Sequence, residues 1–106
     1  MMKRPTKEQS THNRKVRELA RDLKNKGFSV KADVGRYKRP SPIGKDKRMP
    51  DIEATSKSGR RIIIEVETPK SWKTDKEQIK TFIRHAAHKK RTSFDIVFTK
   101  PRKSSR

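Results

Sequence analysis

The chain has 106 residues and a formal net charge of +19, from 31 lysines and arginines against 12 aspartates and glutamates. Such a length suits one small domain, and a hydrophobic share of 27% leaves material for only a thin core. The sequence has no cysteine and no apolar run of the ~20 residues that span a bilayer, which excludes disulfides, Cys-ligated zinc and a transmembrane helix. We expect no membrane partner and a soluble, cytoplasmic protein.

The first predicted element is an amphipathic helix that begins near residue 6 and ends at Gly27. Thr6 and Gln9 fit a capping box at its start, and Ser10 is a second candidate cap. Its basic outer face is compatible with either plain solvation or phosphate contact. The apolar positions recur at helical spacing: Val16, Leu19, Ala20 and Leu23.

A strand and a long loop follow this helix. Residues 28–34 alternate apolar with polar side chains, which predicts a strand with one buried face. Residues 35–49 contain two prolines, two glycines and six basic residues, so we do not expect them to pack in a core. We expect a mobile basic loop along a phosphate backbone, with Tyr37 available to stack; an irregular connector is the alternative.

Residues 51–67 predict a β-hairpin around which the rest of the chain is organised. Residues 51–56 alternate polar with apolar, and residues 62–66 are almost wholly apolar and β-branched. If residues 57–59 form the loop, with Gly59 at a positive φ, Ile52 faces Ile64 and Asp51 faces Glu65.

This register gathers acidic side chains on one face of the hairpin, opposite the core. Two carboxylates about 4 Å apart repel by about 4 kcal/mol at an effective dielectric of 20, so the crowding needs an explanation. One is pairing with lysines and arginines; the other is a divalent cation, typically Mg²⁺, between Asp51 and Glu65 as these project side by side into solvent. The face carries, with Ile63, four acids: Asp51, Glu53, Glu65 and Glu67.

A second helix and a last strand complete the predicted elements. Trp72 is expected to cover the edge of the core, with base stacking as the alternative. Thr74 and Glu77 fit a capping box for the helix. Its expected buried stripe is Ile79, Phe82, Ile83 and Ala86. Residues 94–98 predict the last strand.

Two histidines of the second helix are weak candidates for a metal site. His85 and His88 lie three residues apart, but no cysteine or third histidine is near them. We expect them to be neutral or to face phosphate.

The predicted fold class is mixed α/β, with an α-β-β-β-α-β core. Three strands form an antiparallel meander, and the second helix returns the last strand parallel to the third. Helices then cover both sides of a four-stranded mixed sheet. We expect one domain over residues 1–106, with basic flexible tails at 1–6 and 100–106 and the mobile loop at 35–49.

The net charge predicts a polyanionic partner, because a basic domain gains free energy by releasing counterions condensed on phosphate. DNA is the expected partner, and RNA is not excluded. The expected contacts come from the loop and from one lysine after the hairpin: Arg36, Tyr37, Lys38, Arg39, Lys45, Lys47, Arg48 and Lys70.

The element order and the hairpin motif resemble the PD-(D/E)XK nuclease superfamily, over roughly residues 12–99. The motif is Pro50-Asp51, thirteen intervening residues, then Glu65-Val66-Glu67 after an isoleucine run. The resemblance implies a restriction endonuclease-like fold with the motif acids on the second and third strands. Gln78 with Phe82 is similar to the glutamine-aromatic pair of RecB-like members.

The resemblance implies a Mg²⁺ site, with Mn²⁺ as a substitute, made by Asp51, Glu65 and the carbonyl of Val66. Catalytic residues would be Asp51, Glu65, Glu67 and Gln78. The family lysine should stand at position 67, where this chain has glutamate. Glu67 could bind a second metal or act as general base, Lys70 or Lys80 could reach in, or catalysis could be lost with binding retained.

Resolvase-like members of the superfamily also contribute a glutamate from the first helix, and Glu18 is the nearest candidate here. We therefore expect a Mg²⁺-dependent DNA endonuclease, acting on branched or single-stranded DNA and possible as a homodimer. The alternative is a noncatalytic nucleic-acid-binding protein, ribosomal-type or genome-packaging. A third idea is that the hairpin acids bind a basic protein.

Overall fold

A computed structural model describes residues 7–99. The elements in chain order are α1 (Lys7–Asn25), β1 (Ser29–Ala32), β2 (Ile52–Thr55), β3 (Arg61–Glu67), α2 (Ser71–Thr74), α3 (Lys76–His88) and β4 (Thr92–Phe98). The predicted tails at 1–6 and 100–106, and Thr6 of the first capping box, lie outside the described residues. No helix within residues 7–99 is long and apolar enough to cross a bilayer.

The four strands form one mixed sheet in the order β1-β2-β3-β4. The pairs β1–β2 and β2–β3 are antiparallel, and β3–β4 is parallel. Ile52 pairs with Ile64, and the Ser56 N–H donates to the Arg60 carbonyl at 2.8 Å, which closes the expected three-residue loop. The predicted fold class and hairpin register are therefore confirmed.

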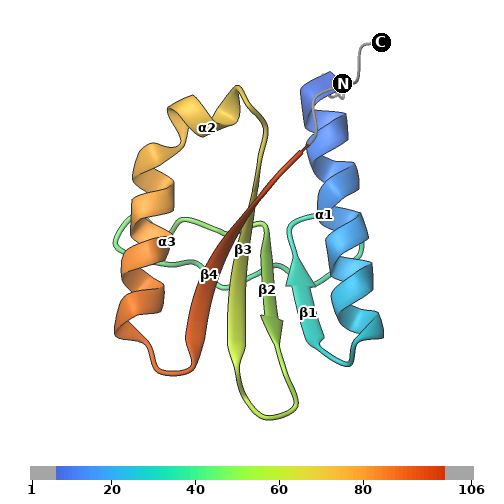
Figure 1. Cartoon of the computed structure of the whole chain (residues 1–106), viewed down its shortest axis with the longest axis vertical. Helices are drawn as coiled ribbons and strands as arrows, with labels where there is room; N and C mark the ends of the chain where they lie inside the picture. Colours follow the sequence, from blue (N-terminus) through green and yellow to red (C-terminus); the bar gives the residue numbers. More distant parts are fainter. Residues whose placement is uncertain (1–6, 100–106) are drawn as a thin grey trace.

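Two hydrophobic clusters cover the two faces of the sheet, because successive side chains of β3 point to opposite faces. On one face, Ile64 and Val66 pack with Val16 and Ala20 of α1. On the other, Ile63 packs with Phe82 of α3. Figure 1 shows α1 and α3 on either side of the sheet.

The loop between β1 and β2 corrects one prediction, because part of it packs in the core. Ile43 is 2% exposed and belongs to the cluster with Ile63 and Phe82. Two backbone hydrogen bonds join Ile43 to Arg48 and close a tight turn. At Gly44 a Cβ atom would come within 2.8 Å of Thr81 Cγ2, so this turn lies directly against α3. The apolar side chain of Ile43 outweighs the polar composition around it.

The segment after β3 also differs from the prediction. A short α2 precedes α3, and the residue that caps α3 is Asp75, without a side-chain cap hydrogen bond. The Thr74 hydroxyl donates to the Ser71 carbonyl instead, so the predicted Thr74–Glu77 capping box is wrong. Ile83, expected in the buried stripe, is 51% exposed. The rings of Trp72 and Phe98 meet edge to face with their centroids 5.3 Å apart, so Trp72 covers the end of β4.

Candidate functional site

A pocket of about 450 Å³ lies where β3 leads into α2, beside the start of β2 and the first turns of α1 and α3. Five of the predicted site residues line it: Asp51, Glu65, Val66, Lys70 and Gln78. The six other lining residues were not predicted as site residues: Gln9, His12, Thr68, Ser71, Thr74 and Asp75. Glu67 does not line the pocket; it is fully buried behind it.

Asp51 is held from two sides. Its Oδ2 atom accepts a hydrogen bond from the Val66 N–H at 2.8 Å and lies 3.0 Å from Nε2 of His12. The hydrogen bond with Asp51 raises the pKa of His12 to about 9, against the lowering effect of burial. At neutral pH His12 is therefore an imidazolium that forms an ion pair with Asp51.

Glu65 lies beside Asp51, as the register predicts. The Asp51 N–H donates to Glu65 Oε1 at 3.1 Å, and the Gln78 side-chain amide donates to Oε2. Burial, and then repulsion from Asp51, raise the pKa of Glu65 to about 9. The expectation of solvent-exposed carboxylates is wrong: Glu65 is 3% exposed and the Asp51 side chain 14%.

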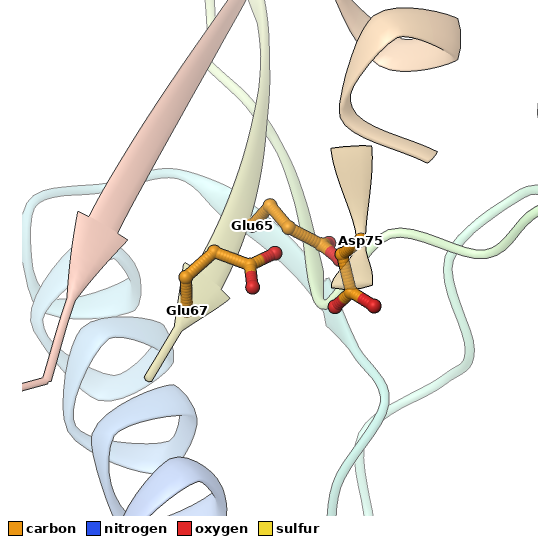
Figure 2. A group of neighbouring side chains, drawn as sticks. All are labelled: Glu65, Glu67 and Asp75. Carbon is orange, nitrogen blue, oxygen red and sulfur yellow. The ribbon is translucent and has the colours of Figure 1, made fainter. Parts of the chain in front are cut away.

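A third and a fourth carboxylate extend this group along β3. Figure 2 shows Glu65, Glu67 and Asp75 gathered between β3 and the α2–α3 junction. One oxygen of each lies within 4.8 Å of the others. Glu67 Oε1 accepts a hydrogen bond from the Ser71 hydroxyl at 2.6 Å, whereas Oε2 is buried and has no partner within residues 7–99. Burial is the main cause that raises the pKa of Glu67.

Glu53, the remaining acid of this face, is neutralised by the protein itself. Its carboxylate accepts hydrogen bonds from Arg61 Nε at 2.7 Å and from the Ser41 N–H at 2.9 Å. Burial acts to raise the pKa of Glu53, but these two donors outweigh it and leave the pKa below its usual value. Pairing with arginine therefore explains one of the four acids that the sequence placed on this face.

The first helix contributes His12 to the pocket, and not Glu18. Glu18 is exposed and pairs with Lys15 at 2.9 Å. A signal for His12 was present in the sequence: it lies four residues before Val16, so it extends the apolar stripe of α1 by one turn. That turn reaches beyond the apolar core, where a polar residue meets the carboxylates.

The two lysines considered as substitutes for the missing motif lysine lie in different places. Lys70 lines the pocket. Lys80 is about two-thirds exposed and lies 3.8 Å from Glu77, outside the pocket lining. Lys70 is thus the one of the two that can act on a ligand in the pocket.

The predicted nucleic-acid-binding residues are spread over several surfaces. Lys45 and Arg48 line a second pocket of about 490 Å³, against α3. Arg39 pairs with Asp33, and Tyr37 packs partly buried against the core rather than standing free. Arg36, Lys38 and Lys47 are exposed.

The second pocket is basic on balance, because its cations, with those that α3 adds, outnumber its two acids, Asp46 and Glu77. Arg84, Lys89, His85 and His88 join Lys45 and Arg48 in its lining. Arg61 Nη1 lies 2.7 Å from His85 Nε2, to which it donates. Burial, with help from Arg61, lowers the pKa of His85, so this ring is neutral at pH 7, as expected.

Comparison of the chain with protein-family models, curated proteins and solved structures found no match. The relationship to PD-(D/E)XK nucleases stays a prediction that depends on the motif residues and their strands.

Proposed function

We propose that the protein is a Mg²⁺-dependent nuclease that hydrolyses phosphodiester bonds of DNA. The observation that supports this most is the position of Asp51 and Glu65, which lie side by side in a pocket of a chain with net charge +19. A purely electrostatic DNA-binding surface gives no reason to bury acids together. A cation that links carboxylates to phosphate does.

The donor atoms of the pocket fit a hard divalent cation. Asp51, Glu65 and the carbonyl of Val66 would hold Mg²⁺ through oxygen alone, as Mg²⁺ prefers. In the bound state the ion supplies Lewis-acid activation of the phosphoryl group and of the attacking water. Both contacts that fix Asp51 engage Oδ2, so Asp51 would bind the ion through Oδ1.

Three side chains around these ligands have supporting roles in this proposal. Gln78 orients Glu65 by a hydrogen bond, and His12 orients Asp51. Lys70, on the pocket wall, supplies positive charge next to the phosphate in place of the motif lysine. Glu67 is fully buried and is not among the residues that line the pocket, so we do not propose it as the general base.

The second, basic pocket supports a DNA substrate. Arg84 lies six residues after Gln78 in α3, which places the basic pocket about 9 Å further along the helix axis. Phosphates on either side of the reacting one could contact it. Such contacts position the backbone without reading its sequence. Cleavage of both strands would require two active sites, and hence a homodimer.

Cleavage of supercoiled plasmid and of a labelled four-way junction with Mg²⁺ tests this proposal. We expect Asp51→Asn to lower the cleavage rate at least about 100-fold, because it removes a ligand charge. Asp22→Asn, the same change at an exposed position of α1, should leave the rate within about twofold. Equal rates for Asp51→Asn and the parent would show that the site is assigned wrongly.

A noncatalytic nucleic-acid-binding protein is the second candidate, and one contact favours it. The His12–Asp51 ion pair supplies Asp51 with a counter-ion from within the protein, without a metal. This candidate predicts binding that depends on salt but not on EDTA, and no cleavage with any divalent ion.

A further inference from the structure

We propose that Glu65, Glu67 and Asp75 form a divalent-cation site of their own, which does not require Asp51. Its ligand class is a hard, oxygen-preferring cation, Mg²⁺ or Mn²⁺. Two of its three carboxylates come from one face of β3, and the third comes from the residue before α3. Asp75 is not part of the nuclease motif, so this site follows from the structure alone.

The spacing of the three carboxylates suits one ion. Around Mg²⁺, opposite ligand oxygens are about 4.2 Å apart and adjacent ones about 3 Å, and only one pair among three ligands can be opposite. The three oxygens lie within 4.8 Å of one another, so the side chains would move closer together to bind one ion directly. Glu65 and Asp75 also line the 450 Å³ pocket, which gives an entry path and room for water ligands.

The unpaired oxygen of Glu67 is an independent sign of a ligand. This side chain is 0% exposed, and its Oε2 has no hydrogen-bond partner within the described residues. An ionised carboxylate oxygen that is buried without a partner carries a desolvation penalty. A cation among the three carboxylates offsets it directly.

The carboxylate of Asp75 is not used to cap the helix that follows it. An aspartate in the cap position of a helix ordinarily accepts a hydrogen bond from a backbone N–H of the first turn. Asp75 occupies that position before α3 but makes no such bond. Its carboxylate lies with Glu65 and Glu67 (Figure 2) and accepts a long hydrogen bond from the Thr74 hydroxyl, at 3.4 Å. Among the ion pairs between residues 9–99, whose side chains the structure describes, none includes any of the three.

This cation would do more than neutralise charge. It would tie the end of β3 to the junction of α2 and α3, and so would fix one wall of the pocket. It shares Glu65 with the proposed catalytic ion but does not depend on nuclease activity, since a protein that only binds DNA could equally hold it.

Manganese provides the test. In crystals soaked with MnCl₂ we expect an anomalous peak among the three carboxylates, and it should persist in Asp51→Asn. By isothermal titration with MnCl₂, Glu67→Gln and Asp75→Asn should each weaken this binding at least about tenfold. Glu77→Gln, an exposed acid in the first turn of α3, is the matched control and should change it less than about twofold.

Two results would overturn the site. One is the absence of any peak and of any binding that depends on Glu67 or Asp75. The other is a single peak between Asp51 and Glu65 that disappears in Asp51→Asn. Asp75 is only partly buried, so Asp75→Asn keeps the test valid if Glu67→Gln does not fold. Binding at the three carboxylates without cleavage would support this site and contradict the nuclease proposal alone.

Discussion

Glu53 and Glu67 lie on the same face of neighbouring strands and both are buried, but their pKa values are shifted in opposite directions. Glu53 has an arginine and a backbone N–H as donors, and its pKa is lowered. Glu67 has a single hydroxyl donor, and burial raises its pKa. The acid with an internal counter-ion is structural, whereas the acid without one marks where an external cation is expected.

Replacement of Arg61, the charge partner of Glu53, should remove the difference between the two acids and have the largest effect on stability. In Arg61→Met the buried Glu53 loses its charge partner, so we expect the free energy of unfolding to fall by about 3 kcal/mol. Arg60→Met, one residue earlier and exposed, should change it by less than about 0.5 kcal/mol. Urea denaturation at pH 7 measures both, and equal losses would mean that Glu53 is not stabilised by Arg61.

The pH dependence of unfolding, measured in EDTA, should sharpen the comparison, because the pKa shifts of the two acids have opposite signs. The lowered pKa of Glu53 contributes stability above its unfolded pKa of 4.5, and this is lost as pH falls. The raised pKa of Glu67 has the reverse effect: stability is present below 4.5 and is lost as pH rises.

Substitution should remove each slope separately. Glu53→Gln should flatten the profile below pH 4.5, and Glu67→Gln should flatten it above pH 4.5, each by about 1 kcal/mol. Thermal or urea unfolding from pH 3 to pH 9 measures this. A loss of the acid-side slope in Glu67→Gln would contradict the assignment of the two environments.

A smaller effect should distinguish arginines used inside the protein from those that face a ligand. Arg61 donates hydrogen bonds to Glu53 and His85 within the protein, whereas Arg84 lines the basic pocket. We expect Arg84→Gln to weaken DNA binding a few-fold and to reduce the salt-dependence slope by about 1. Arg21→Gln, the same charge change on α1, serves as control in a fluorescence anisotropy titration at several salt concentrations. A larger effect at Arg21 would argue against the pocket.

The fold and about half of the pocket residues could be predicted from the sequence, because the alternation of side chains along a strand allows few pairing registers. Once Gly59 fixed the hairpin loop, the partners of Ile52 followed, and so did the positions of Asp51 and Glu65. Gln78 followed from its place in the helix after β3.

The rest depended on contacts between segments far apart in the chain, which local patterns do not encode. His12 reaches Asp51 across 39 positions. Asp75 was overlooked because Thr74 suited the capping position, and the short α2 moved the start of α3 by one residue. Ile43 looked like a loop residue because its neighbours are polar, yet one apolar side chain was enough to anchor the turn.

The anchoring of Ile43 has a consequence for how binding of a polyanion would affect the stability of the fold. An unfolded chain keeps the +19 charge but loses the concave arrangement that Ile43 gives to Lys45 and Arg48 beside α3. A polyanion that fits this hollow binds the native state preferentially and raises the melting temperature. A flexible polyanion that is attracted by charge alone binds the native and the unfolded chain about equally, so it should not raise the melting temperature.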